Sequence, residues 1–234
     1  MKVFSFCLYG PYKPLYYEGL IENIHLIHRH FPDWSIIVYF GADVDVRSAG
    51  VICSAPRVIG RFTGEIGGVN MIHRFFAIDE PGVELMMVRD ADSRIHWRDR
   101  WAIRQFEKST FVAHAIRDNR VHRVTLLGGL WGLRKSAGIN IRKEYEAFKA
   151  NPSSNNLGLD QDFLAFHITP LVRDRVLAHV GNGGPYDKDE THVEFPFPPQ
   201  DNFYCGQVEQ PGFVDTPGPR SQGSLPSNIL KLSR

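Results

Sequence analysis

The segment comprising residues 83–89 restricts the fold of this chain more than any other, because its run Leu85-Met86-Met87-Val88 is apolar at every position. A strand with one solvated face alternates apolar and polar side chains, whereas a strand buried on both faces does not. Such a strand needs a layer of helices on each side of its sheet. The run therefore predicts a central strand of an α/β sheet, and two carboxylates, Asp90 and Asp92, follow where it ends.

Other strand-like runs alternate with helix-length segments, which is typical of a mostly parallel sheet flanked by helices. Further strands are predicted at residues 3–8, 35–40, 51–54, 110–116, 125–133 and 175–180. Helices are predicted from Pro14 to the residue before Pro32, and at 69–78, 97–108, 139–150 and 159–168. The first helix carries an apolar stripe at Tyr16, Leu20, Ile24, Ile27 and Phe31.

The length of 234 residues and the hydrophobic content of 43% suit one domain with one substantial core. After Gly181 prolines and glycines accumulate and periodicity is lost. We therefore expect the segment after Gly181 to be irregular, to wrap the body and to fray beyond about Pro211. The predicted division is a catalytic domain at residues 1–210 and an irregular tail or linker at 211–234.

Charge and cysteine usage exclude several classes of protein. The 27 Lys and Arg residues balance 26 Asp and Glu residues, so no nucleic acid partner is expected. Cys7, Cys53 and Cys205 lack the spacing of a disulfide framework or a zinc site, which favours a reducing, cytoplasmic compartment. No run approaches the roughly 18 to 20 apolar residues that span a bilayer. The oligomeric state stays open.

The triplet Asp90-Ala91-Asp92 is the main candidate for chemistry. It lies at the predicted carboxyl edge of a buried strand, where open α/β sheets bind ligands. Residues i and i+2 of an extended chain point the same way, so the two acids could share one hard divalent cation with diphosphate oxygens. A triplet of this kind also arises by chance, as Asp43-Val44-Asp45 shows.

Four motifs in order resemble glycosyltransferases of the GT-A fold, and most of all the small soluble glycosyltransferase domains of chloroviruses and other large algal viruses. The motifs are residues 88–94 (VRDADSR), 113–118 (AHAIRD), 127–132 (LGGLWG) and 159–164 (LDQDFL). The likeness spans about residues 1–180, and residues 203–208 could continue it. It implies transfer of a sugar, a hexose or deoxyhexose, from a nucleoside-diphosphate sugar, with UDP favoured, to a glycan or glycoprotein hydroxyl. A virus-encoded protein would act in the host cytoplasm.

The resemblance also implies roles for individual residues. Asp90 and Asp92 would hold Mn²⁺ or Mg²⁺, with His179 as a third ligand. Asp160 or Asp162 would lie near the reacting carbon or the acceptor hydroxyl. The implied nucleotide and donor residues are Phe6, Tyr9, Tyr12, Arg61, Arg74, Arg89, Asp90, Gly128, Gly129 and Trp131.

Each role has a structural alternative. Gly128-Gly129 could be a strand bulge, and His114 and His179 could be buried core residues. Asp160 could cap a helix, while Asp162 could lie on a solvated face. Arg89 and Arg94 could bind phosphate or pair with Asp90 or Asp99. The candidates Asp187, Asp189 and His192 compete with His179 for the third metal position.

Two rival functions stay open. A nucleotidyltransferase acting on sugar phosphates would also use paired acids on a parallel sheet, but it needs a glycine-rich, lysine-containing phosphate loop after the first strand. Residues 9–13 (YGPYK) are a poor version of that loop. A non-catalytic carbohydrate-binding module would usually be all-β, which the predicted first helix argues against.

Overall fold

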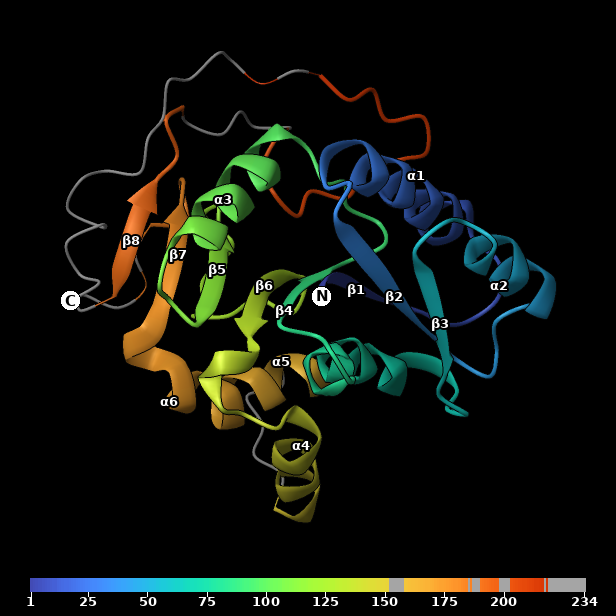
Figure 1. The fold of residues 1–234 in the computed structure, drawn as a ribbon, viewed down its shortest axis with the longest axis horizontal. Coiled ribbons are helices and arrows are strands. Elements are labelled where there is room, and N and C mark those ends of the chain that lie inside the picture. Colours follow the sequence, from blue (N-terminus) through green and yellow to red (C-terminus); the bar gives the residue numbers. More distant parts are fainter. Residues whose placement is uncertain (152–157, 185, 187–189, 198–202, 217, 219–234) are drawn as a thin grey trace.

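An eight-stranded sheet organises the part of the chain that the computed structural model describes, which is residues 1–151, 158–184, 186, 190–197, 203–216 and 218 (Figure 1). The strands lie in the order β3-β2-β1-β4-β6-β5-β7-β8. They are β1 (Lys2–Leu8), β2 (Trp34–Phe40), β3 (Val58–Phe62), β4 (Leu85–Arg89), β5 (Ala113–Arg117), β6 (Leu130–Arg134), β7 (Val176–Val180) and β8 (Thr191–Glu194). In this sheet β6 runs antiparallel to β4 and β5, and the other pairs are parallel. The predicted mostly parallel sheet is confirmed.

Helices cover both faces of the sheet. One layer contains α1 (Pro14–His30), α2 (Val46–Cys53) and α3 (Trp97–Lys108), and the other contains the 3₁₀ helix η1 (Gly67–Asp79), α4 (Ile141–Ala150) and α5 (Leu159–Phe163) (Figure 1). The shorter elements are η2 (Lys135–Ala137), the π-helical turn η3 (Leu164–Ile168), α6 (Thr169–Val172) and η4 (Arg173–Arg175). The chain is therefore an α/β sandwich.

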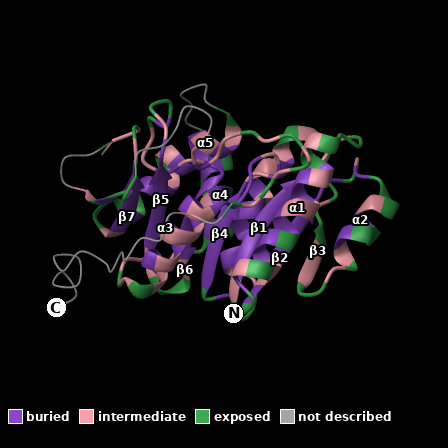
Figure 2. Ribbon diagram, turned by 90° about the horizontal axis from the view of Figure 1, so that it is seen from above, coloured by how far each residue is buried: buried purple, intermediate pink, exposed green. Residues whose placement is uncertain are grey.

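The strand β4 lies between the two helical layers, as its apolar run predicts. Its residues are all buried, and Figure 2 shows the central strands buried along their length. Met87 packs in the core beneath α1 and α3, whereas Met86 and Val88 pack in the core beneath η1 and α4. Because strand side chains alternate between faces, Arg89 projects toward the α3 layer and Asp90 toward the η1 layer.

The helix α1 begins at Pro14, whose fixed φ suits the first turn, and ends at His30. Its buried stripe contains Tyr17, Leu20, Ile24 and Ile27, so the predicted place of Tyr16 in the core was wrong. Residues 17, 20, 24 and 27 follow the 3.6-residue period more closely than a stripe beginning at residue 16. Tyr16 instead lies on the side of α1 that meets the candidate site.

Three other predicted elements need correction. Residues 51–53 end the helix α2 rather than forming a strand, because the Asp45 carboxylate accepts a hydrogen bond from the Ser48 backbone N–H at 2.9 Å and caps a helix that reaches Cys53. Residues 125–129 are loop, and β6 begins only at Leu130. The strand β8, which pairs with β7, lies within the segment predicted to be irregular.

The described part of the tail remains attached to the body beyond Pro211. The Asp215 carboxylate accepts hydrogen bonds from Arg100 Nη1 of α3 at 2.7 Å and from His30 Nε2 of α1 at 2.6 Å. The prediction that the chain frays from about Pro211 is therefore wrong as far as Asp215. The division into a domain at residues 1–210 and a tail at 211–234 stays a prediction.

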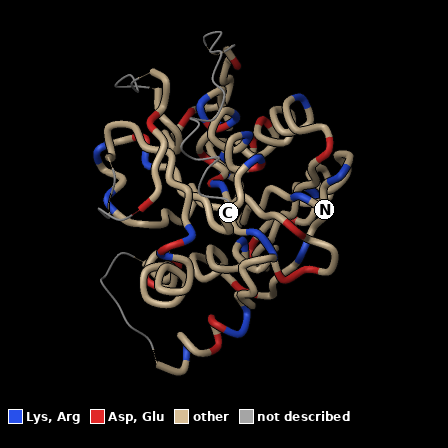
Figure 3. Tube along the Cα trace, turned by 60° about the vertical axis from the view of Figure 1, so that its left-hand side comes forward, with Lys and Arg blue, Asp and Glu red and all other residues tan. Residues whose placement is uncertain are grey.

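Positive and negative side chains are interspersed around the molecule (Figure 3). Among the described residues, no helix is both long and apolar enough to cross a membrane.

Candidate active site

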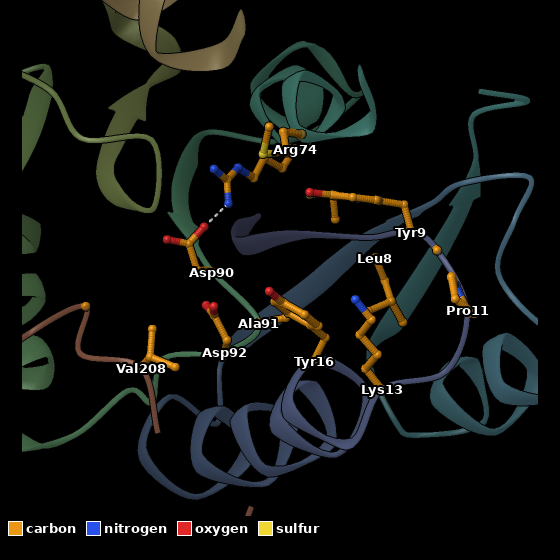
Figure 4. A pocket seen from close by; sticks show the side chains of 14 residues that line it. Leu8, Tyr9, Pro11, Lys13, Tyr16, Arg74, Asp90, Ala91, Asp92 and Val208 are labelled. Atoms are coloured by element: carbon orange, nitrogen blue, oxygen red, sulfur yellow. Dashed lines mark hydrogen bonds and ion pairs between the residues drawn. The ribbon is translucent and has the colours of Figure 1, made fainter. Parts of the chain in front are cut away.

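A cavity of about 500 Å³ opens at the carboxyl ends of β1 and β4 (Figure 4). The strand order reverses at β1, because β1 pairs with β2 on one side and with β4 on the other. Ligands of open α/β sheets bind at such a reversal. The cavity is lined by Cys7, Leu8, Tyr9, Gly10, Pro11, Lys13, Tyr16, Met71, Arg74, Asp90, Ala91, Asp92, Gly206 and Val208.

Both acids of the predicted triplet reach this cavity. Asp90 and Asp92 are partly exposed along its wall, and the intervening Ala91 is buried against α1 (Figure 4). Burial raises the pKa of Asp92, and the neighbouring Asp90 charge raises it further. Two carboxylates that repel each other beside a cavity form a site that attracts a cation.

The helix α1 positions the loop that carries these acids. A Cβ at Gly19 would lie 2.4 Å from the Ala91 carbonyl oxygen, so glycine is required for the loop to approach the helix. The Asn23 side chain donates to the Ser93 carbonyl at 2.7 Å and accepts from the Ile95 N–H at 3.1 Å. The Asn23 side chain therefore fixes the backbone of the loop at two positions.

Arg74 of η1 joins two parts of the site. Its guanidinium is buried, pairs with Asp90, and donates from Nη2 to Asp160 Oδ2 at 2.9 Å. Asp160 lies at the start of α5 and is itself buried. Because one guanidinium binds both carboxylates, Arg74 sets the separation of β4 and α5 at the cavity.

The two glycines of the loop before β6 permit this arrangement. A Cβ at Gly129 would lie 1.9 Å from Asp90 Oδ2, and a Cβ at Gly128 would lie 2.8 Å from Asp160 Oδ2. The Gly128 N–H also donates to Gln161 Oε1 at 3.1 Å, while Gln161 Nε2 donates to the Leu126 carbonyl at 2.7 Å. The missing side chains thus make room for the carboxylates of the site.

The C-terminal segment, residues 203–209, forms one wall of the cavity. Val208 makes an antiparallel bridge with Ser93, and the Glu209 N–H donates to the Asp92 carbonyl at 2.8 Å. A segment more than 100 residues away in sequence therefore contacts the metal-binding candidate directly.

A divalent cation fits the chemistry of Asp90 and Asp92. Both offer hard carboxylate oxygens to the same cavity, and these are the ligands that Mg²⁺ and Mn²⁺ prefer. Arg74 binds Oδ1 of Asp90. The Asp92 carboxylate faces the cavity (Figure 4).

No protein-family model matches the chain, and no curated protein matches it. Among solved structures, the galactosyltransferase LgtC, in complex with donor and acceptor sugar analogues, matches with a TM-score of 0.52 and 11% identity over 76% of this chain and 73% of that one. An active-site mutant of LgtC matches with a TM-score of 0.53 and 11% identity over 76% and 72%. The chain has the GT-A fold. Identities this low show the fold alone.

A glycosyltransferase involved in the glycosylation of the major capsid of PBCV-1 matches with a TM-score of 0.48 and 12% identity, over 77% of this chain and 82% of that one. This score is too low to carry an argument. The chlorovirus resemblance is therefore supported only at the level of the shared GT-A fold.

The GT-A fold of this chain brings some of the predicted site residues together and separates others. The predicted residues that meet at or beside the cavity are Asp90, Asp92, Arg74, Tyr9, Gly128, Gly129 and Asp160. Asp162 follows in α5, buried and outside the cavity lining. Asp187 and Asp189 lie outside the described residues, and His192 belongs to β8.

Strand parity explains why two predicted donor residues, Phe6 and Arg89, do not reach the cavity, whereas packing in the core keeps Trp131 away from it. Phe6 lies in the core beneath α1, whereas its neighbour Cys7 lines the cavity. Arg89 projects to the same face as Phe6, where its Nε donates to Asp99 Oδ1 at 3.1 Å. Trp131 faces the same helical layer as Cys7, but it is buried in that core against Phe75 and lies outside the cavity lining.

The remaining predicted residues lie on strands away from the cavity or make contacts on the surface. Arg61 lies on β3, beyond β2, and pairs with Glu80 at 3.1 Å on the surface. Tyr12 is exposed, and its hydroxyl donates to Glu18 at 2.7 Å. His179 lies on β7, which β6 and β5 separate from β4, and its Nδ1 is 2.8 Å from His114 Nε2. The structure therefore does not bring His179 to the two acids.

Sequence reasoning missed several residues of the site. Lys13 and Tyr16 line the cavity because the start of α1 faces it, and Gly206 and Val208 belong to the C-terminal segment. Gln161 contacts the glycine loop. Its position beside Asp160 in the fourth motif was a usable signal, whereas Gly206 and Val208 were marked only by the extension of the family likeness to residues 203–208, which assigned them no role.

Proposed function

We propose that this protein is a glycosyltransferase that moves a sugar from a nucleoside-diphosphate sugar to a hydroxyl of a glycan acceptor. The observation that carries the proposal is the pair Asp90 and Asp92, which emerges beside one cavity at the strand-order reversal of a GT-A fold. The fold alone does not specify an activity. The paired acids would hold the divalent cation that neutralises a diphosphate leaving group.

The diphosphate end of the donor is assigned to the cavity wall between β4 and α1. Asp90 and Asp92 would hold Mn²⁺ or Mg²⁺, which when bound neutralises the charge that develops on the departing nucleoside diphosphate. Lys13 lines the same cavity and offers an ammonium group to phosphate oxygens. The base is assigned to the end of β1, where Tyr9 and Tyr16 present aromatic rings (Figure 4).

The sugar is assigned to the Arg74–Asp160 pair. A guanidinium and a carboxylate held 2.9 Å apart can donate to and accept from neighbouring hydroxyl groups. Asp160 is the acid that we place nearest to the reacting carbon, and Asp162, two residues later in α5, is the alternative. If the configuration inverts, one of the two must accept the acceptor proton within hydrogen-bond reach.

Isothermal titration with UDP and GDP, each with Mn²⁺, with Mg²⁺ and with a chelator, tests the proposal. We expect metal-dependent binding that favours UDP. Substitution Asp92→Asn should weaken that binding at least about tenfold, which corresponds to about 1.4 kcal/mol. The matched control is Asp45→Asn, which alters the other Asp-x-Asp triplet and retains an efficient N-cap for α2.

Two results would contradict the proposal. One is the absence of nucleoside diphosphate binding with any of these metals in a folded protein. The other is unchanged metal-dependent binding in Asp92→Asn. Incubation with nucleotide sugars should release nucleoside diphosphate, whereas release of pyrophosphate from a nucleoside triphosphate and a sugar phosphate would identify a nucleotidyltransferase instead.

A further inference from the structure

A second group of ligand-type side chains lies buried at the beginning of α3. His96 is the N-cap residue of α3, Asp99 is in its first turn, and Cys205 belongs to the C-terminal segment. One candidate ligand atom from each lies within 4.8 Å of the others. All three residues are at most 4% exposed. The group is thus shielded from solvent and joins two distant parts of the chain.

The polar atoms of this group are incompletely satisfied. Asp99 Oδ1 accepts from Arg89 Nε at 3.1 Å, but Asp99 Oδ2 has no hydrogen-bond partner among the described residues. It lies 3.8 Å from His96 Nδ1, which is too far for a hydrogen bond. His96 Nε2 likewise has no partner within the described part of the chain. A buried polar atom without a partner costs about 1–3 kcal/mol, so a native protein needs a reason to keep it.

A bound cation would satisfy Asp99 Oδ2 and bind one ring nitrogen of His96, whose Nδ1 otherwise accepts a hydrogen bond from the Arg98 backbone N–H at 3.2 Å. Imidazole nitrogen, carboxylate oxygen and thiolate sulfur together are a donor set for a borderline-soft ion, and zinc binds all three types. Ligand atoms around tetrahedral zinc are roughly 3.3–3.8 Å apart, given bonds of about 2.0–2.3 Å, so a small contraction of the group suffices. Magnesium and manganese disfavour thiolate.

The surrounding charges leave room for an added cation. Arg89 is paired with Asp99, and Arg98 donates from Nε to Asp118 Oδ2 at 2.6 Å, so both neighbouring guanidinium groups are already neutralised. Burial raises the pKa of the Cys205 thiol well above its usual range, and the Asp99 and Asp118 charges raise it further. The thiol is therefore protonated until a metal ion displaces the proton to solvent.

We propose that His96, Asp99 and Cys205 bind a zinc ion that fastens the C-terminal segment to the beginning of α3. The fourth position of the tetrahedron is left to water. The segment continues from Cys205 into Gly206 and Val208, which line the candidate active-site cavity. The zinc ion therefore holds one wall of that cavity in place. Because Asp90 and Asp92 are not among its ligands, the zinc site stands independently of the proposed transferase activity.

The spacing of the cysteines indicated no zinc site because only one cysteine is a ligand, and it is distant in sequence from the other two ligands. His96 and Asp99 are neighbours only through one helical turn, and Cys205 is brought to them by the tertiary fold. A Cys-x-x-Cys pattern marks sites in which neighbouring residues of one loop supply the ligands. A site assembled across the fold has no such local pattern.

Cobalt substitution tests the proposal on the chain of residues 1–234. Protein expressed in cobalt-supplemented minimal medium, and separately protein refolded with Co²⁺, should show the near-ultraviolet sulfur-to-cobalt charge-transfer band of one thiolate-bound Co²⁺. The band should disappear in Cys205→Ser and persist in the matched control Cys53→Ser, whose sulfur lies on α2 away from the group. Zinc should displace the cobalt and abolish the band, whereas Mg²⁺ should not.

The wild-type spectrum decides the matter even if Cys205→Ser fails to fold. A folded wild-type protein that takes up no cobalt, or takes it up without the sulfur band, overturns the proposal, as does a band that persists in folded Cys205→Ser. In the proposed site the band should also survive Asp92→Asn, and its loss in that variant would place the cobalt elsewhere. Zinc should raise the melting temperature of the wild type but not that of Cys205→Ser.

Discussion

Substitution Gly129→Ala should separate the position of Asp90 from the stability of the fold. The Cβ of the alanine would lie 1.9 Å from Asp90 Oδ2, whereas Cβ contacts in proteins essentially never fall below 3.0 Å. The carboxylate must therefore retreat by about 1 Å. Because φ at residue 129 is not in the left-handed region, an alanine introduces no backbone strain there, and this displacement is the main effect.

The magnitude follows from what Asp90 contacts. Its side chain is 42% exposed, so it can swing into the cavity, and the loss of its pair with Arg74 should cost no more than about 1 kcal/mol of stability. Arg74 keeps its hydrogen bond to Asp160 at 2.9 Å. A metal ligand displaced by about 1 Å, however, can lower turnover about 100-fold. We therefore expect a small change in stability and a large loss of metal-dependent activity.

The assay measures the free energy of unfolding by urea denaturation, together with metal-dependent binding of nucleoside diphosphate and turnover of nucleotide sugar. The control is Gly50→Ala, in which the new methyl group meets nothing within 4 Å on an exposed turn of α2 and should stabilise the protein by about 0.5–1 kcal/mol. Unchanged donor binding and turnover in Gly129→Ala would refute the reasoning, because the clash would then leave Asp90 in place.

Three further predictions concern buried polar groups. Substitution Arg74→Ala leaves Asp160 buried without its cation and should lower the free energy of unfolding by about 3 kcal/mol, with partial recovery in Arg74→Lys; a loss below about 0.5 kcal/mol in urea denaturation would contradict this. Substitution Asp118→Ala removes the partner of Arg98 and the acceptor of the Cys205 N–H at 3.0 Å, so residues 203–209 should be cleaved faster in limited proteolysis, whereas wild-type rates would argue against the anchor. Burial lowers the pKa of His179 to about 3 and also holds the pKa of His114 well below its usual range, so the unfolded chain takes up these protons first. The stability that these two neutral histidines contribute is therefore fully present above about pH 6.5, and the free energy of unfolding should fall by about 1.4 kcal/mol per pH unit for each histidine as the pH decreases toward 3. Urea denaturation midpoints measure this decrease, and substitution of the exposed His25 (His25→Gln) is the control. Midpoints that do not change between pH 7 and pH 4.5 would exclude the effect.

Local patterns were sufficient where burial on both sides of an element shapes the sequence itself. The apolar run of β4 predicted a central strand, and the helix predicted at residues 97–108 has the same bounds as α3. The place of Asp90 and Asp92 followed from these patterns together with the general rule on strand ends. Local patterns failed at residues 51–54, because a short apolar run suits a helix end as well as a strand.

The amino-acid sequence by itself determined the α/β class, the central strand, and the presence of two acids at its carboxyl end, because hydrophobic period and chain order are properties of neighbouring residues. The tertiary structure alone decided which side chains reach the cavity. A shift of one residue along a strand reverses the face, which separates Cys7 from Phe6 and Asp90 from Arg89. It also decided that two strands, β6 and β5, separate His179 from the strand that carries the acids, and that residues 206 and 208 complete the wall, since contacts between distant segments depend on how the whole sheet is ordered.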